Sequence, residues 1–239
     1  MRYIPRWLRR CLFNLFAWTV ILVIALPLVW MIITSIKPQS ELFLIPPAFF
    51  PEEVTFEHYR RLLTETPFLT YLRNSVILAG GTTVLVIVVA TLGAHSLVRF
   101  NYPGRETLAG AVLFTYLLPS VVLVIPLYFL MAALGLVNSL LSLVIAYTTF
   151  ALPYALWLLR SFMSAIPADL EAAALVDGAS RFRAFIDVIL PQAAPGIIST
   201  ALFTAILAWN EYLFALVLIN SDASRPLTTG VMSMLVTSF

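Results

Sequence analysis

The chain has 239 residues, of which 61% are hydrophobic and 11% are charged, and its formal net charge is +2. Soluble domains carry about 45–50% apolar and about 25% charged residues, so this composition excludes an ordinary soluble domain and favours a protein that is solvated by lipid. The small net charge argues against nucleic acid as a partner. We therefore predict an all-α integral membrane protein, a polytopic helical bundle.

Five apolar stretches are long enough to cross the hydrocarbon core, which takes about 20 residues. They cover residues 11–35, 75–98, 107–131, 139–161 and 196–220. The first stretch is longer than the core of a secretory signal and no small-residue cleavage site follows it, so it is predicted to be a retained helix. Prolines at positions 119, 126 and 153 predict bends in the third and fourth spans.

The arginines predict how these spans are oriented. Four precede the first span, and five lie in the loops 99–106 and 160–194, namely Arg99, Arg105, Arg160, Arg181 and Arg183. The positive-inside rule places the N-terminus and both loops in the cytoplasm, and counting five crossings gives the same result. Residues 36–74 are then an outer loop with a short interfacial helix capped by Thr55, for which either a plain surface role or a gate or docking role is open.

The segment 162–194 is the most informative part of the chain. Pro167 suits the first position of a helix and Gly178 suits the left-handed residue beyond its end, so a helix of about three turns is predicted between them. The small alanines of this helix would let the surface of a partner approach, and Glu171 would be free to meet a cation on that partner.

A second short helix is predicted directly after the first. Ser180 would cap it, Pro191 would end it, and an apolar stripe would hold it against the bundle. The stripe consists of Phe182, Phe185, Ile186 and Ile189.

The segments Glu171-Ala172-Ala173, Asp177-Gly178-Ala179 and Ile189-Leu190-Pro191 resemble the EAA motif of ABC importer permeases. The resemblance implies that residues 162–194 form a coupling loop whose helix fits a cleft in an ATP-binding subunit. The matching positions are Glu171, Ala172, Ala173, Asp177, Gly178, Ala179, Ile189 and Pro191.

Further stretches are similar to the carbohydrate-uptake branch, specifically to the maltose-transporter-type inner-membrane subunit with the shorter outer loop. They are Thr34-Ser35-Ile36-Lys37, Arg73-Asn74-Ser75, Pro119 with Pro126-Leu127-Tyr128, Phe150-Ala151-Leu152-Pro153-Tyr154 and Ala208-Trp209-Asn210-Glu211. The resemblance covers nearly the whole chain. It implies one transmembrane permease domain over residues 1–239, in the bacterial inner membrane, forming half of the translocation path for a sugar or sugar-like solute.

The same resemblance implies the partner subunits of the chain and a missing sixth span. We expect a second homologous permease, two ATP-binding subunits, an extracytoplasmic substrate-binding protein and membrane lipid around the chain. ATP and magnesium would bind the partner subunits, with no cofactor or metal on this chain. Permeases of this type usually have six spans, so a sixth is expected to be missing after Phe239.

The residues themselves argue against an enzyme. A phosphate-binding G-x-x-x-x-G-K-[ST] loop needs a lysine after a glycine, and the one lysine, Lys37, has no glycine near it. The sequence also contains neither H-E-x-x-H nor G-x-S-x-G, so no catalytic residues are expected. We predict a transport subunit whose ATP is hydrolysed by other chains.

Glu211 lies about fifteen residues into the last predicted span, where an unpaired acid is unfavourable. Either Trp209, Asn210 and Glu211 line the translocation path or its outer gate, or they form a structural hydrogen-bond cluster. An ion-coupled secondary transporter is the alternative function. Such carriers usually place several ionisable groups in their spans, whereas Glu211 stands nearly alone.

Overall fold

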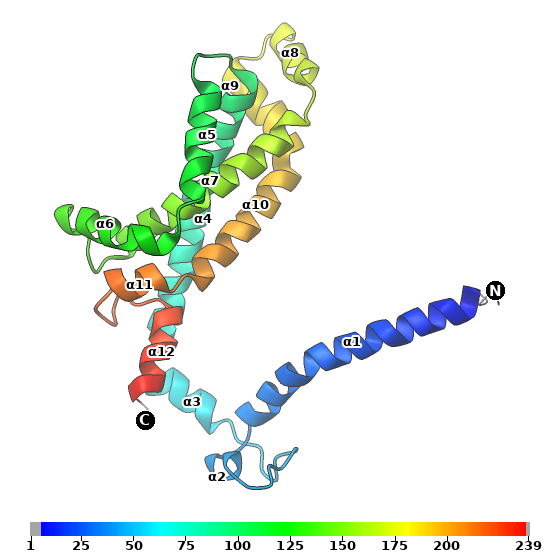
Figure 1. Ribbon diagram of the computed structural model, residues 1–239, viewed down its shortest axis with the longest axis vertical. Coiled ribbons are helices and arrows are strands. Elements are labelled where there is room, and N and C mark those ends of the chain that lie inside the picture. The colour runs from blue at the N-terminus through cyan, green and yellow to red at the C-terminus, as the bar shows by residue number, and fades with distance from the viewer. Residues whose placement is uncertain (1–5, 238–239) are drawn as a thin grey trace. The chain divides into compact units, whose positions relative to one another are not determined.

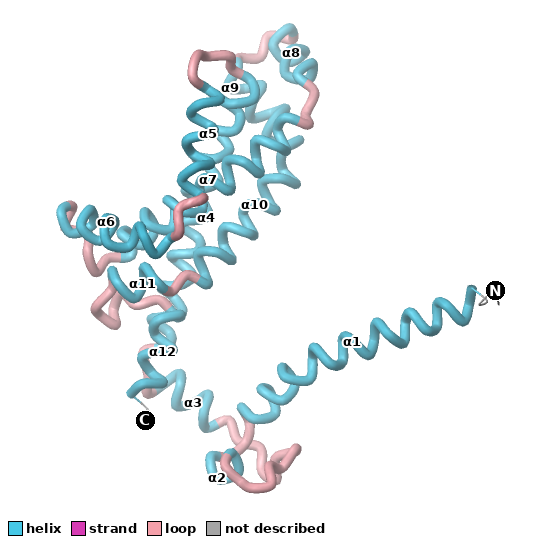
Figure 2. Tube along the Cα trace, in the orientation of Figure 1, coloured by secondary structure: helices cyan, strands magenta, loops and turns pink. Residues whose placement is uncertain are grey.

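The computed structural model describes residues 6–237, and all the regular secondary structure in this range is helical (Figure 2). Within it, four helices are long and apolar enough to span a membrane: Arg9–Ser35, Phe68–Arg99, Leu140–Ser164 and Arg181–Asn210. A fifth span results if the bent pair Arg105–Tyr116 and Ser120–Ala133 is counted as one. The all-α class is therefore confirmed, with four to five apolar spans. The chain divides into two compact units between Thr66 and Pro67, which are described separately below.

The first unit contains α1 (Arg6–Ser35), α2 (Gln39–Leu42) and α3 (Glu57–Thr64). Lys37, directly after α1, is only 3% exposed although it is the one lysine of the chain. Its Nζ donates a hydrogen bond to the carbonyl oxygen of Ala48 and lies 5.1 Å from the ring centroid of Trp30. The loop after α1 is thus folded back onto the helix end by a buried cation.

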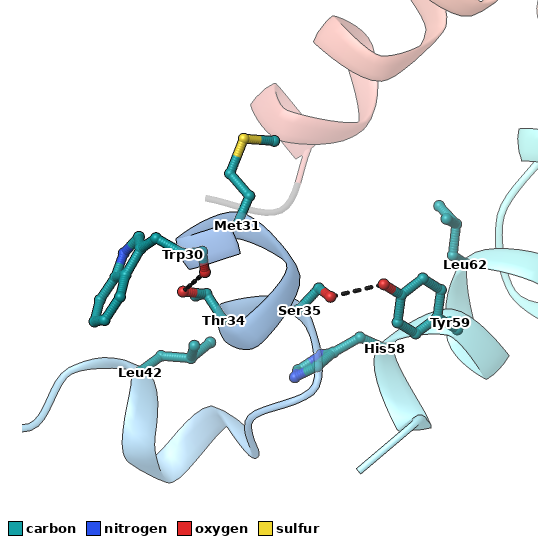
Figure 3. A pocket seen from close by; sticks show the side chains of 8 residues that line it. All are labelled: Trp30, Met31, Thr34, Ser35, Leu42, His58, Tyr59 and Leu62. Atoms are coloured by element: carbon teal, nitrogen blue, oxygen red, sulfur yellow. Dashed lines mark hydrogen bonds between the residues drawn. The ribbon is translucent and has the colours of Figure 1, made fainter. Parts of the chain in front are cut away.

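The short helix α3 also packs onto the end of α1. The predicted role of Thr55 is only partly confirmed. Phe56 stands at the cap position of α3, but the Thr55 Oγ1 one residue earlier accepts a hydrogen bond from the Glu57 N–H at 3.2 Å. The hydroxyls of Ser35 and Tyr59 are hydrogen-bonded at 2.7 Å beside a cavity of about 500 Å³ (Figure 3). Trp30, Met31, His58 and Leu62 are among the residues that line this cavity (Figure 3).

The second unit is built around three long helices that lie side by side: α4 (Phe68–Arg99), α7 (Leu140–Ser164) and α10 (Leu190–Asn210) (Figure 1). Small side chains fill much of their interface, and Ala90, Ala94 and Ala155 are fully buried. Small residues let helix backbones approach closely, which is the usual way that helices associate where lipid removes the hydrophobic drive between them.

The third predicted span is broken rather than bent. It consists of α5 (Arg105–Tyr116) and α6 (Ser120–Ala133), whose axes differ by 101°. Pro119 stands directly before α6 in an extended conformation, as expected of a residue that cannot continue a helix at this point. Pro126 and Pro153 lie inside α6 and α7.

The last predicted span has different bounds in the structure. One continuous helix runs from Arg181 to Asn210 through α9 (Arg181–Ala184), the π-helical turn η1 (Phe185–Ile189) and α10. The predicted span at 196–220 is therefore placed too late, and the prediction that Pro191 ends a helix is wrong. The wide π turn directly before Leu190 and Pro191 accommodates a residue that lacks an N–H and would clash in a regular α turn.

Two further helices follow α10: α11 (Leu213–Leu218) and α12 (Leu227–Thr237). The apolar helix α12 was not predicted, because residues after position 220 were assigned to an outer segment. Its start is held by α4, since the Ser75 Oγ accepts a hydrogen bond from the Leu227 N–H at 2.8 Å. Asn74 donates from Nδ2 to the carbonyl oxygens of Ala223 and Arg225, at 2.9 Å each, which fixes the segment before α12.

Candidate functional site

The predicted coupling loop lies at one end of the second unit. Its helix α8 (Ala168–Val176) and the following α9 are at the opposite end of the bundle from α6, α11 and α12 (Figure 1). The predicted compact helix is confirmed, with Pro167 as the residue before the first helical position rather than the first position itself. Asp169 and Glu171 stand in the first turn, where carboxylates interact favourably with the helix dipole.

The end of α8 explains the Asp177-Gly178-Ala179 segment. Gly178 has φ +93°, the left-handed conformation that the sequence predicted for it. Its N–H donates to the Leu175 carbonyl oxygen at 3.1 Å, and the Ala179 N–H donates to that of Ala174 at 3.0 Å. This pair of bonds is a Schellman motif, which ends the helix and turns the chain toward Ser180.

The second helix of the loop is only partly as predicted. Ser180 accepts a hydrogen bond from the Arg183 N–H at 3.3 Å, which confirms the predicted cap. Phe185 and Ile189 are buried, but Phe182 is 71% and Ile186 39% exposed, so half of the predicted stripe is wrong. The π turn adds a residue to one helical turn and rotates the apolar stripe away from the regular spacing on which the prediction depended.

The surface of α8 is exposed almost everywhere. All nine residues of this helix are described, and among them Glu171 is the one that is buried. Ala172 and Ala173 are exposed, as are Leu170, Leu175 and, at 87%, Val176. Exposed apolar side chains gathered on one short helix are typical of a surface that contacts another protein.

Glu171 does not project toward a partner, which corrects the expectation that it is free to meet a cation on another chain. It is 7% exposed. Its Oε2 lies 3.0 Å from Arg99 Nε, and its Oε1 lies 3.9 Å from His95 Nε2. The Arg99 Nε–H is not aimed along the line to Oε2, so the contact is an ion pair rather than a linear hydrogen bond. A buried carboxylate needs such a counter-charge, because desolvation of an unpaired ion is costly.

Arg99 and His95 were not predicted as site residues. Arg99 served only to orient the spans. The available signal was that Arg99 ends a predicted span on the same side of the membrane as the loop that carries Glu171. The sequence could not show that these residues are in contact, since the pairing is made across helices.

Glu211 stands at a break in the helix, not in the middle of a span. The residue follows Asn210, the last residue of α10, with φ −67° and ψ 132°. Its carboxylate accepts hydrogen bonds from the Phe214 N–H at 3.1 Å and the Ala215 N–H at 3.4 Å, which satisfies the open start of α11. Its own carbonyl oxygen accepts from the Thr228 hydroxyl at 2.9 Å. The acid is thus paired with backbone groups.

A cavity of about 360 Å³ lies beside this break. Asn210 and Glu211 line it together with Tyr147 and Phe150 of α7 and Ser120 at the start of α6. Trp209 does not line this cavity and is 37% exposed. The structure therefore brings two of the three predicted path residues to one hollow. In the part of the chain that the structure describes, no group of three or more His, Cys, Asp or Glu side chains is placed to hold a metal ion.

The geometry defines a multi-span helical protein with a helical break after its last long helix and an exposed loop helix. Comparison with known proteins assigns its family. Residues 87–238 match the family described as binding-protein-dependent transport system inner membrane component. The chain belongs to this family.

Several characterised relatives are similar over most of their length. The sulfoquinovosyl glycerol transport permease of Agrobacterium fabrum is 35% identical over 86% of this chain and 72% of its own. The trehalose transport permease of Mycobacterium tuberculosis is 39% identical over 83% of this chain and 72% of its own. The trehalose/maltose transport permease of Thermococcus litoralis is 34% identical over 94% of this chain and 81% of its own.

A solved structure supports the fold. A chain of a bacterial ABC transporter that imports the acidic polysaccharide alginate superposes with a TM-score of 0.85, at 23% identity, covering 99% of this chain and 84% of that chain. The protein is thus a multi-pass inner-membrane permease subunit of an ABC importer and not an enzyme, and it works with an ATPase and a substrate-binding protein. These findings support this assignment and not the ion-coupled alternative.

Proposed function

We propose that this chain forms half of the translocation path for a sugar or sugar-like solute. It pairs with a second homologous permease, two ATP-binding subunits that carry ATP and magnesium, and an extracytoplasmic substrate-binding protein. The relatives named above support the solute class, since their names specify sulfoquinovosyl glycerol, trehalose and maltose. Binding of ATP closes the ATPase pair and switches the bundle between inward-facing and outward-facing states, and hydrolysis resets it.

The exposed helix α8 carries the coupling part of this proposal. Ala172 and Ala173 offer a small, exposed surface that the backbone of a partner can approach, and exposed Leu170, Leu175 and Val176 offer apolar contact. The Schellman motif at Gly178 fixes the angle at which the chain leaves this surface. The positions proposed to act in coupling are Glu171, Ala172, Ala173, Asp177, Gly178, Ala179, Ile189 and Pro191.

The distribution of arginines supports placing α8 in the cytoplasm, and the four arginines that precede the first span support the same side for the N-terminus. Arg160 binds the Glu106 carboxylate at 2.8 Å, Arg99 donates to the Ile166 carbonyl oxygen, and Arg181 lies over the Phe100 ring at 5.5 Å. These arginines thus gather at the α8 end of the bundle. An excess of arginine marks the cytoplasmic side of a membrane protein.

Two adjoining cavities support a path for a polyol. The cavity at Asn210 and Glu211 shares Leu207 with a second one, also of about 360 Å³, that is lined by Tyr116, Tyr154 and Phe203. Tyr116 and Tyr154 are stacked with ring centroids 6.1 Å apart. Aromatic faces beside hydrogen-bonding side chains suit a solute that has both apolar ring faces and hydroxyl groups.

The coupling role is tested by Gly178→Val in the whole transporter, reconstituted in liposomes with its binding protein. A side chain here meets no neighbour but must adopt φ +93°, so the end of α8 is distorted and uptake per ATP should fall roughly tenfold. Gly110→Val is the matched control, because Gly110 also has open space around it and lies inside α5. Normal coupling in the Gly178 variant, or uptake driven by an ion gradient without ATP, would contradict the proposal.

The path role is tested by Asn210→Ala, which removes an amide from the cavity beside the helix break. Uptake should fall several-fold while the affinity of the binding protein for its solute is unchanged. Asn101→Ala, in an exposed loop before α5, is the control. Wild-type uptake in the Asn210 variant, with normal assembly, would remove this residue from the path.

A further inference from the structure

A buried cluster of charged side chains joins α8 to the end of α4. Arg99 is the last residue of α4 and lies 3.0 Å from the Glu171 carboxylate, with both side chains about one-tenth exposed. His95, one turn earlier on α4, faces the other carboxylate oxygen at 3.9 Å. The His95 ring lies between those of Phe100 and Phe185, with centroids at 5.7 Å and 4.6 Å. The carboxylate therefore meets two groups whose positions are fixed by α4.

Arg99 holds α8 at two points. Besides its contact with Glu171, its Nη2 donates a hydrogen bond to the Ile166 carbonyl oxygen at 2.9 Å, just before α8 begins. Because Glu171 is the buried residue among the nine of α8, this cluster supplies the buried side-chain attachment of the helix to the bundle. A guanidinium can make both contacts at once because its donors are spread over a rigid plane.

Helix α4 reaches from this cluster to the other end of the bundle. Its 32 residues extend for about 48 Å at 1.5 Å per residue. Near its start, the Tyr71 hydroxyl donates to Asp222 at 2.8 Å, and Asn74 and Ser75 hold residues 223–227. A displacement of Arg99 along α4 therefore acts on the segment that follows the break at Glu211 and leads into α12.

We propose that Arg99 is a positioning residue for transport, and that its ion pair with Glu171 is the link through which movement of α8 displaces α4. The inference rests on the proposed coupling function of α8. It assigns Glu171 an action within this chain, with His95 as the second group that orients the carboxylate. Arg99 is not among the residues that line the two cavities of the proposed path, and it acts through Glu171.

A double-mutant cycle in the complete reconstituted transporter tests this link. Arg99→Gln, Glu171→Gln and the double variant are compared for solute molecules imported per ATP hydrolysed. Each single variant should lower this ratio roughly tenfold, and the double variant should lower it no further, because both remove one interaction. Arg99→Lys keeps the charge but cannot hold Glu171 and Ile166 together, so it should recover part of the ratio.

The control is Arg183→Gln, which removes an arginine from the same loop. Arg183 is 76% exposed and pairs with Asp187 at 3.4 Å, so its loss should leave the ratio unchanged. Normal coupling in Arg99→Gln, or effects that multiply in the double variant, would overturn the proposal and indicate that Glu171 acts on another chain. If the Gln variants fail to assemble, Arg99→Lys with Glu171→Asp completes the same cycle.

Co-purification of the ATPase with the wild-type chain and its variants tests the coupling function of α8 separately from the link through Arg99. If the ATPase does not associate at all, the proposed coupling function fails. If the ATPase associates normally with every variant but the two single-variant effects multiply in the double variant, only the link through Arg99 fails.

Discussion

Glu171 and Glu211 are two acids of the same helical bundle whose charges are accommodated in different ways. Glu171 is buried against two side chains of another helix, Arg99 and His95. Glu211 is half-buried at a break between α10 and α11, where backbone N–H groups of Phe214 and Ala215 bind its carboxylate. Glu171 therefore requires a positive charge nearby, whereas Glu211 requires only hydrogen-bond donors. The comparison indicates that Glu171 links two helices and that Glu211 shapes one chain segment.

The largest effect is expected from removal of the counter-charge of Glu171. Arg99→Ala leaves a buried carboxylate with His95 alone, so the free energy of unfolding in mixed micelles should fall by about 3–5 kcal/mol. Denaturant titration of the purified chain, followed by helical circular dichroism, measures it. A loss below about 1 kcal/mol would show that water or another group replaces the guanidinium.

A smaller effect is expected at the helix break. Glu211→Ala removes the acceptor of the Phe214 and Ala215 N–H groups, and loss of a helix cap costs about 0.5–2 kcal/mol. The same titration measures it, with hydrogen exchange of these two amides as a local readout. If exchange is unchanged, the carboxylate is not what holds the start of α11.

A still smaller loss in the free energy of unfolding is expected when only the charge of Glu211 is removed. Glu211→Gln keeps an oxygen that accepts from the backbone, so it should cost about 0.5 kcal/mol, because neutral and charged side chains cap helices almost equally well. Glu171→Gln, by comparison, leaves Arg99 buried without its carboxylate and should approach the Arg99→Ala value. Equal losses in the two glutamine variants would contradict the difference in charge requirement between Glu171 and Glu211.

The smallest effect is expected at an exposed pair in the same loop as Glu171. Arg183 and Asp187 are 76% and 60% exposed, so water already solvates both charges. Arg183→Ala should cost about 0.3 kcal/mol, as for other exposed pairs four residues apart on a helix. A loss as large as that of Arg99→Ala would mean that burial does not explain the different contributions of the two ion pairs to stability.

Much of the fold was predictable because it depends on local patterns. Apolar stretches of about 20 residues located the three long helices α1, α4 and α7, since lipid requires each span to satisfy its own backbone. Gly178 and Ser180 predicted a helix end and a helix start correctly, because a left-handed φ and a hydroxyl cap involve only neighbouring residues. The EAA-like motif likewise located the loop that the structure leaves exposed.

The bends and breaks were decided by tertiary structure. A proline shows that a helix is disturbed, but not whether it bends, breaks by 101° as before α6, or continues through a π turn as at Pro191. These outcomes depend on what packs against each segment. The helical break at Glu211 is stabilised by Thr228 of α12, a contact that no local pattern contains.

The sequence by itself determined that this is a membrane permease with a short helix, closed by Gly178, in the loop before its last long helix. It also showed that Glu211 needed a partner, because an unpaired acid is unfavourable within a span, whereas it left Glu171 free to meet a cation on another chain. Only the tertiary structure decided that Glu171 pairs with a guanidinium at the end of α4 and Glu211 with a pair of backbone amides. The free-energy cost of burying an acid depends on the residue type, which the sequence contains. The group that compensates for this cost depends on which helices come into contact.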